Sequence, residues 1–244
     1  MVSTPVDEAT FAELRKIDTP TITNVVATYP RNQLCLGLYN PWTEQWYTDT
    51  SIRCIYPELG AVVGHAVTCV FGLPDPNYTG RLSYMDVVDA LYAAPKPTIL
   101  VIQQKFPPEL MARVGLVGEL MATSMRSLGC VGLLSNGPSR DIDAVRRLRF
   151  QMLLGGVTAG HGEMAVHGVN IPVSVGGMDV APGEIVHMDE NGAVKFPADK
   201  APAVLANAKA LLADEDRRLV ALREATTAEA VKAAFGGQAY SEKK

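Results

Sequence analysis

The segment Gly118–Asp141 reads GELMATSMRSLGCVGLLSNGPSRD, and its pattern decides the fold class. Residues 118–128 are predicted to form a helix, which the next glycine ends in the left-handed conformation common at helix C-termini. Residues 130–135 have the small and apolar side chains of a buried strand. A turn is predicted at 136–138, and a further helix over 141–148. Helix, strand and helix alternate here, which indicates an α/β fold.

The rest of the chain extends this alternation and then changes it. Helices are predicted at 7–16, 19–27 and 84–93. Strands are predicted at 60–71 (a strand pair or one bent strand), 98–104, 151–154, 171–175, 184–188 and 192–196. The turn Asn191-Gly192 is typical of a β-hairpin. Antiparallel strands late in the chain favour an α/β sandwich over a Rossmann sheet.

One long segment before these strands is irregular and aromatic, over residues 30–59. Loops longer than about 12–15 residues inside a compact domain are often functional. We expect Trp42 or Trp46 to approach the pocket of its own or a neighbouring subunit. The alternative is that both pack at a subunit interface, where tryptophan is enriched.

The C-terminal part of the chain differs in composition. Residues 199–235 are rich in Ala and Leu and predict one or two helices, with a break near Thr226-Thr227. We therefore expect a single α/β domain over residues 1–198, followed by a helical extension over residues 199–244.

Composition excludes several classes of protein. The 22 Lys and Arg residues and 26 Asp and Glu residues give a net charge of -4 with no basic patch, so we expect no nucleic-acid partner. No apolar run reaches the about 18–20 residues of a membrane span, and the first residues lack the pattern of a signal peptide. The four cysteines match no zinc-binding spacing. We expect a cytoplasmic protein with reduced thiols.

Gly118 is predicted to open the helix that follows it. The first amides of a helix have no partners within the helix, and together with the helix dipole they attract a carboxylate or a phosphate. Many helices begin with glycine and bind nothing, which is the alternative interpretation.

Arg140 and Asp141 follow a predicted strand end, where α/β proteins usually bind ligands. An arginine can grip a carboxylate with two hydrogen bonds. An aspartate can hold Mg²⁺, which keeps several waters and needs only one or two protein carboxylates; Glu119 could receive one of those waters. The alternative is that Asp141 only caps the helix from residue 142, with Arg140 a surface charge.

Other chemistry has less support. The histidines fit loop or core positions better than metal sites, at His65, His161, His167 and His187. The chain has no GxGxxG after a strand, no phosphate-binding GxxxxGK[ST] and no GxSxG. Lys105 follows a strand end and could form a Schiff base if buried.

Several motifs in this order resemble the RraA-like family, which includes 4-hydroxy-4-methyl-2-oxoglutarate / 4-carboxy-4-hydroxy-2-oxoadipate aldolases. The segments that carry the resemblance are Gly118-Glu119-Leu120-Met121-Ala122, Gly129-Cys130-Val131-Gly132, Arg140-Asp141-Ile142-Asp143, Gly64-His65-Ala66-Val67-Thr68, Ile171-Pro172-Val173, Gly176-Gly177, Pro182-Gly183-Glu184 and Asp189-Glu190-Asn191-Gly192. The likeness covers roughly residues 15–198.

The resemblance implies an α/β/β sandwich of the swivelling β/β/α type that forms a trimer or a dimer of trimers. It implies Mg²⁺ or Mn²⁺ held by Asp141, mostly through waters, one of which Glu119 orients. It also implies that Arg140 binds a small 2-oxo acid, with amides presented by Gly118, Leu120 and Met121. The implied reaction passes through a pyruvate-type enolate, by retro-aldol cleavage or by β-decarboxylation of oxaloacetate.

This sequence departs from the family pattern at three positions. Ala144 stands where an acid is usual, three residues after Asp141, and glutamates stand for aspartates at Glu119 and Glu184. The resemblance also leaves a second function open, since some members regulate RNase E by binding protein without a working site. The presence of Arg140 and Asp141 favours a lyase.

Overall fold

The protein is described from a computed structural model over residues 6–28, 33–75 and 82–235. Its strands are β1 (Arg53–Cys54), β2 (Val62–Gly72), β3 (Thr98–Lys105), β4 (Cys130–Ser139), β5 (Gln151–Val157), β6 (Ala165–Val169), β7 (Val173–Val175), β8 (Met178–Val180), β9 (Ile185–Asp189) and β10 (Gly192–Phe196). Its α-helices are α1 (Glu8–Leu14), α2 (Thr19–Val26), α3 (Tyr84–Ala93), α4 (Pro108–Met111), α5 (Glu119–Ser127), α6 (Ile142–Arg147), α7 (Ala201–Glu224) and α8 (Ala228–Ala234). Two 3₁₀ turns lie at Pro57–Leu59 and Ala198–Lys200.

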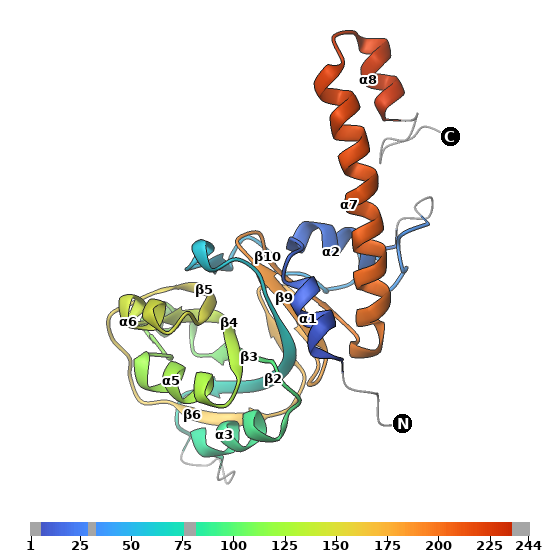
Figure 1. Ribbon diagram of the computed structural model, residues 1–244. Helices are drawn as coiled ribbons and strands as arrows, with labels where there is room; N and C mark the ends of the chain where they lie inside the picture. Colours follow the sequence, from blue (N-terminus) through green and yellow to red (C-terminus); the bar gives the residue numbers. More distant parts are fainter. Residues whose placement is uncertain (1–5, 29–32, 76–81, 236–244) are drawn as a thin grey trace.

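The centre of the fold is one strongly curved sheet, in the order β1-β5-β4-β3-β2-β9-β10 (Figure 1). The strands β2, β3, β4 and β5 are parallel neighbours, so their carboxyl ends meet at one edge. Helices α3, α5 and α6 cover one face of these strands, and β7-β8 packs on the other face. Parallel strands buried on both faces are the usual solution in α/β proteins, and these are strongly apolar.

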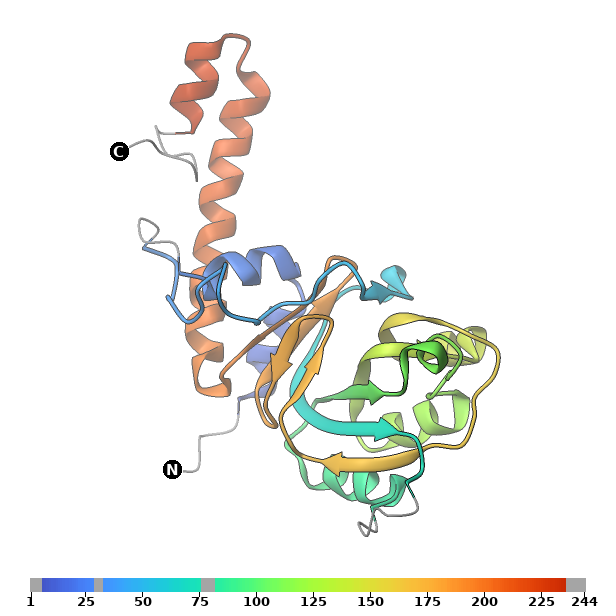
Figure 2. The same ribbon diagram turned by 180° about the vertical axis from the view of Figure 1, so that it is seen from behind.

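β2 is the strand that bends the sheet. Its residues 65–72 pair with β3 on one side, while its other side pairs with β9 over residues 62–65 and with β6 over residues 69–72. The sheet therefore curls round until it is nearly closed (Figure 2). The bent strand, the α/β sandwich and the C-terminal helices are confirmed.

Several details of the prediction differ from the structure; among them, α4 and β8 were not predicted. The predicted turn at residues 136–138 belongs to β4, which continues to Ser139 through a shift of register between Ser135 and Pro138. Asn, Gly and Pro in sequence suggest a turn, but here the side chains of Gln104 on β3 and Asn136 on β4 bridge the two strands beyond the end of their ladder. The strand β6 was not predicted, because its five residues contain a glycine and a histidine.

The aromatic segment is anchored on a second core formed by α1, α2 and α7. Trp46 is 2% exposed and stacks on Tyr39, with the ring centroids 5.5 Å apart. This burial leaves Trp46 no surface for a ligand. Trp42 is 89% exposed, and its approach to a pocket remains a prediction.

The long helix α7 has two unlike halves. Its buried residues are Ala201, Val204, Ala208 and Leu211, which lie on one side of the first three turns and pack against α1 and α2. Beyond Leu211 the helix projects away from the sheet, and α8 turns back against it (Figures 1 and 2). The division of the chain near residue 198 remains a prediction. Among the described residues, no helix is both long and apolar enough to cross a membrane.

A buried histidine joins the N-terminal helices to the sheet. Nε2 of His187 lies 3.1 Å from the Leu14 carbonyl oxygen, and Nδ1 lies 2.9 Å from Oγ1 of Thr19. The Thr19 amide donates to Asp189 at 2.7 Å. Burial lowers the pKa of His187, so the imidazole is held neutral.

We predict that the protein loses stability as the pH falls below about 6.5, the usual pKa of an unfolded histidine. Because the folded-state pKa of His187 is lowered, the unfolded chain takes up the proton first, and acidification favours unfolding. His65, whose pKa is also lowered by burial, adds to the same slope. Urea unfolding at pH values from about 5 to about 8 measures this dependence.

The matched variants are His187→Gln and His161→Gln, of which only the first removes a buried ring. The first should flatten the dependence of the unfolding free energy on pH, whatever its effect on stability at pH 8. The second should leave the dependence as it is. Equal slopes in all three proteins would contradict the assignment to His187.

Candidate functional site

The residues of the predicted site lie together at the edge where the parallel strands end. The segment before α5 runs beside the end of β4: the Leu116 amide donates to the Pro138 carbonyl at 3.1 Å, and the Arg140 amide donates to the Val117 carbonyl at 3.0 Å. These two hydrogen bonds place the start of α5 beside Arg140 and Asp141. Residues far apart in the sequence therefore meet, as the family resemblance implies.

A hydrogen bond closes this arrangement. The Glu119 amide, the first in α5, donates to Oδ2 of Asp141 at 3.0 Å. A Cβ atom at Gly118 would lie 2.4 Å from the same oxygen and 3.1 Å from Nε of Arg140. Only glycine fits here, because the carboxylate approaches the backbone so closely.

The two following amides of α5 remain free. Among the described residues, neither the Leu120 amide nor the Met121 amide donates to an acceptor. They lie in the first turn of a nine-residue helix, where amides lack partners within the helix. A ligand carboxylate would satisfy them.

Asp141 has an unusual backbone conformation for a residue at the N-cap position of a helix. Its φ of 56° and ψ of 39° place it in the left-handed region, which costs a non-glycine residue energy. It occupies the N-cap position of α6, yet its side chain does not cap that helix. The side chain is instead turned to α5. The alternative that Asp141 serves only as a cap for α6 is therefore wrong.

The Arg140 side chain is partly exposed, and its buried Nε lies beside the carboxylate of Asp141. Its Nε is 3.8 Å from Oδ2 of Asp141, while the side chain as a whole is 35% exposed. Nε is buried and has no hydrogen-bond partner among the described residues. A guanidinium with an unused buried donor is well suited to bind an anion that enters the site.

Tyr56 fixes the helix that follows. Its hydroxyl donates to the carbonyl of Ile142 at 2.7 Å, in the first turn of α6. Burial raises the pKa of Tyr56 to about 12, so the phenol stays protonated and keeps donating. Arg146 lies over the same ring, 5.2 Å from its centroid. α6 is thereby held against the sheet with Asp141 at its start.

The oxygen donors of Asp141 and Glu119 suit a hard divalent cation that keeps most of its waters. Oδ1 of Asp141 receives no hydrogen bond from any described residue, the side chain is 41% exposed, and Glu119 is exposed nearby. Within the described part of the chain, no three His, Cys, Asp or Glu side chains are grouped so that they could hold a metal ion. The residues therefore fit a hydrated Mg²⁺ or Mn²⁺ and do not form a closed zinc cage.

Other candidate residues lie elsewhere. Lys105 ends β3 and is exposed, whereas a Schiff-base lysine is usually desolvated in an apolar pocket. Glu184, one of the departures from the family pattern, binds Lys195 at 3.0 Å and accepts the Ala181 amide at 2.7 Å. Its longer side chain therefore closes a turn and pairs with a neighbouring strand. Ala144 is half-buried on α6, and Asp143 is exposed.

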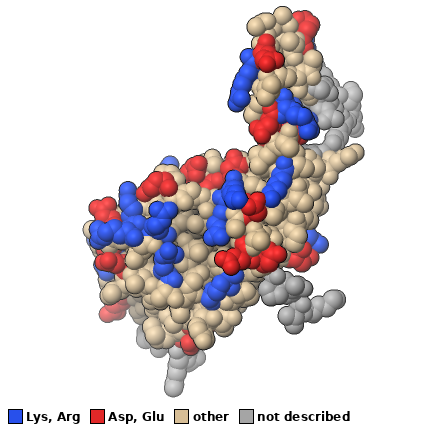
Figure 3. All heavy atoms as spheres, viewed as in Figure 1, with Lys and Arg blue, Asp and Glu red and all other residues tan. Residues whose placement is uncertain are grey.

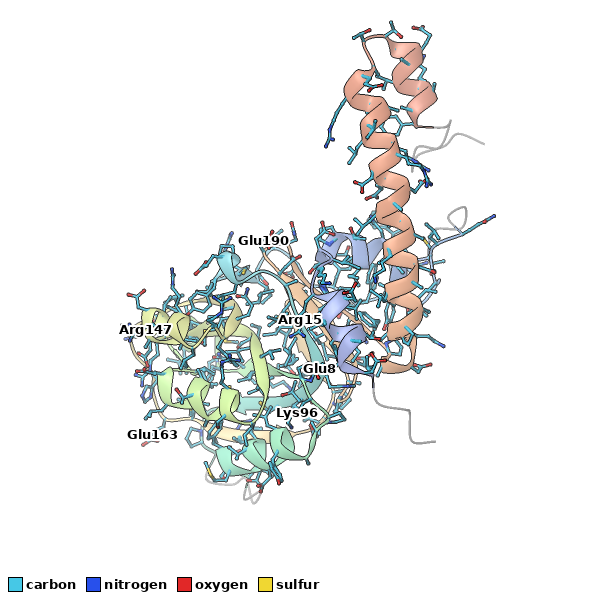
Figure 4. All side chains as sticks on the ribbon, viewed as in Figure 1. Glu8, Arg15, Lys96, Arg147, Glu163 and Glu190 are labelled. Atoms are coloured by element: carbon cyan, nitrogen blue, oxygen red, sulfur yellow. The ribbon has the colours of Figure 1, made fainter. Side chains whose placement is uncertain are left out.

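Basic side chains, with acidic ones among them, lie on the surface near α6 (Figure 3), and a cavity lies beside the segment that leads to α5. Lys and Arg side chains gather over the end of the molecule where α6 lies, and Arg147 is among them (Figures 3 and 4). These basic side chains attract small anions. A cavity of about 530 Å³ lies against the segment that leads to α5, where the Gly115 amide donates to Gly160 at 2.8 Å. The cavity is lined by Leu73, Pro74, Leu110, Arg113, Val114, His161, Gly162 and Glu163.

Sequence reasoning missed a polar cluster behind the site. Gln104 and Ser139 are buried to 1% and 0% exposure, and Asn136 bonds to the backbone of Gln104. The available signal was a pair of glutamines at the end of an otherwise apolar strand. The side-chain partners of Gln104 could not be deduced, since they lie 31 to 34 residues away.

We predict that Gly118→Ala lowers the free energy of unfolding by about 1–3 kcal/mol, as overpacking usually does. The added carbon would lie 2.4 Å from Oδ2 of Asp141, so it must displace this carboxylate from the Glu119 amide. Urea unfolding measures the change. Gly162→Ala is the control, since nothing lies within 4 Å of its added carbon. Equal effects of the two substitutions would contradict the packing described.

Comparison with known proteins identifies the family of this chain. The first of three curated relatives is a Halalkalibacterium halodurans protein that carries the provisional name 4-hydroxy-4-methyl-2-oxoglutarate aldolase, 29% identical over 133 residues, 54% of this chain and 61% of that protein. An Alcanivorax borkumensis protein with the same provisional name is 31% identical over 86 residues, 35% of this chain and 54% of that protein. The chain thus spans about half to three fifths of these two relatives.

Solved structures show the same fold. An uncharacterised Pseudomonas syringae protein superposes with a TM-score of 0.73 at 18% identity, covering 98% of both chains. A Streptomyces coelicolor protein, described as an unusual member of the RNase ES inhibitor RraA protein family, superposes with a TM-score of 0.65 at 20% identity, covering 87% of this chain and 96% of that one. The sequence pattern of the family described as RraA-like, Aldolase/RraA, matches residues 38–195, and the chain therefore belongs to the RraA-like family.

Proposed function

We propose that this protein is a lyase that cleaves a small 2-oxo acid with the help of Mg²⁺ or Mn²⁺. The observation that carries the proposal is the joint between α5 and Arg140-Asp141. It puts two free amides, an arginine with an unused donor and a half-exposed carboxylate within one site. The provisional aldolase names of two relatives support the same reaction class.

Different residues of the site bind the substrate and the metal ion. The substrate carboxylate is received by the Leu120 and Met121 amides and by the guanidinium of Arg140, so the 2-oxo acid is held in one orientation. Asp141 and Glu119 supply the oxygen atoms for a hydrated cation. When bound, such a cation supplies Lewis-acid stabilisation of negative charge on the substrate.

The chemistry follows from where charge develops. Breaking the C3–C4 bond of a 2-oxo acid leaves its electron pair on C3, delocalised to the 2-oxo oxygen as an enolate. Arg140 is a fixed donor beside this charge, and because the charge on the 2-oxo oxygen develops only as the bond breaks, Arg140 stabilises the transition state more than the ground state. The enolate then takes up a proton to give pyruvate.

Two substrates share this requirement. In oxaloacetate the group that leaves C3 is carbon dioxide. In 4-hydroxy-4-methyl-2-oxoglutarate the C4 hydroxyl gives up its proton and C4 leaves as the carbonyl of a second pyruvate. Because both release pyruvate from the same enolate, one assay for pyruvate serves both.

The second candidate is a regulator that binds a protein partner and has no catalysis. This function is considered because the Streptomyces coelicolor protein is described as a member of the RNase ES inhibitor RraA protein family. A regulator has no need of a glycine that admits a carboxylate to a helix N-terminus, nor of an aspartate in the left-handed region. These two features favour the lyase.

We predict that the protein releases pyruvate from oxaloacetate or 4-hydroxy-4-methyl-2-oxoglutarate with Mg²⁺ or Mn²⁺, and that EDTA abolishes this release. Asp141→Asn should lower kcat/KM by about 100-fold or more. Asparagine tolerates the left-handed backbone of Asp141, so this variant removes the charge and keeps the fold. A coupled lactate dehydrogenase assay measures the rate, against a blank with the metal ion and no protein.

Asp143→Asn is the matched control, because Asp143 is exposed two residues further along and should not affect the rate. If neither acid is cleaved above the blank with either metal ion, the lyase proposal fails and the regulator remains. Borohydride inactivation that persists in EDTA would instead indicate a Schiff base on Lys105.

We further propose that the protein assembles as a trimer or a hexamer. Leu120 is 89% exposed although it lies in the first turn of α5, beside the site, and a neighbouring subunit would cover it. Multi-angle light scattering should give three or six times the chain mass of 26.2 kDa. A single species of monomer mass at micromolar concentration would contradict this.

A further inference from the structure

Gln104 lies behind the candidate site, at the end of β3. It is 1% exposed, and its carboxamide lies directly against Gly137 of β4. A Cβ atom at Gly137 would be 2.2 Å from Cδ of Gln104. A side chain at position 137 would therefore have to displace the Gln104 carboxamide from its place against β4.

The side chain of Gln104 holds the end of β4 by hydrogen bonds. Its Nε2 donates to the Pro138 carbonyl at 3.2 Å and to Oγ of Ser135 at 3.1 Å. The same Pro138 carbonyl accepts the Leu116 amide at 3.1 Å. One carbonyl oxygen thus joins β3, β4 and the segment that leads to Gly118.

The backbone of Gln104 is bound as well. Its amide donates to Oδ1 of Asn136 at 2.6 Å, and its carbonyl accepts Nδ2 of Asn136 at 3.1 Å. The register between β3 and β4 ends at Ile102 and Ser135. Beyond that point the side chains of Gln104 and Asn136 take over the cross-strand hydrogen bonds that the backbone no longer makes.

We infer that Gln104 is a positioning residue for Arg140 and Asp141, which rests on the function proposed above. It fixes Pro138, two residues before Arg140, and through the shared carbonyl it fixes Leu116, two residues before Gly118. It touches neither the candidate ligand groups nor the solvent. Its effect reaches the site through the backbone, and a displacement of about 1 Å at a reacting group can cost about 100-fold in rate.

The neighbouring Gln103 provides a matched control. It has the same side chain, is half-buried, and points to the opposite face of β3, where its Oε1 accepts the Ser174 amide at 3.4 Å. Gln104→Met and Gln103→Met each remove one carboxamide and keep a similar volume. Only the first removes the hydrogen bond to Pro138.

The first measurement needs no substrate. Hydrogen–deuterium exchange of the full chain, followed by mass spectrometry, should show faster exchange in Gln104→Met for peptides that contain residues 116–119 and 138–141. The rest of the sheet should exchange as in the parent protein. Gln103→Met should leave both peptides unchanged. Unchanged exchange in Gln104→Met, or a rise spread over the whole sheet, would overturn the inference.

The second measurement is the rate of pyruvate release by the two variants. Gln104→Met should lower kcat for pyruvate release about tenfold or more, whereas Gln103→Met should stay within about twofold. If Gln104→Met does not fold, Gln104→Glu serves in both measurements, since it keeps the shape and replaces the donor with a carboxylate. A parent protein without lyase activity refutes the proposed function alone, because exchange still decides the positioning role. A parent protein with activity that Gln104→Met and Gln104→Glu retain in full refutes the positioning role alone.

Discussion

The hydrogen bond from the Glu119 amide to the Asp141 carboxylate is the contact on which the arrangement of the site depends. It joins the first turn of α5 to the end of β4, two elements that parallel strand order brings to one edge of the sheet. Three further features follow from it. Gly118 lacks a side chain because the carboxylate needs the space, Asp141 accepts a left-handed backbone so that its side chain can turn back, and the segment before α5 pairs with the end of β4.

Much of this could be predicted from the sequence. The helix over 118–128, the hairpin near Asn191-Gly192 and the break near Thr227 were predictable because each depends on neighbouring residues: a terminal glycine, a two-residue turn and an N-cap threonine. The turn itself lies at Glu190-Asn191, one residue earlier than predicted, since Gly192 pairs with Asp189. The meeting of Gly118 with Asp141 was predictable only from the family pattern, since 22 residues of chain separate the bonded groups.

The wrong predictions concern residues whose conformation depends on partners far away in the sequence. The segment at 136–138 has local features of a turn, but Gln104 of another strand holds it extended, and no local rule reports a partner on β3. The same limit applies to Trp46, whose stacking on Tyr39 inside the second core is set by packing between α2, α7 and the sheet. Residues that depend on distant partners are those that local patterns describe least well.

The two halves of α7 have a consequence for measurements on this protein in solution. The helix beyond Leu211 rises by about 1.5 Å per residue, so its remaining 13 residues extend roughly 20 Å from the body. A particle with such an arm tumbles and diffuses more slowly than a sphere of the same mass. Elution volume in size-exclusion chromatography would therefore overstate the mass of one chain, and a monomer could be mistaken for a dimer.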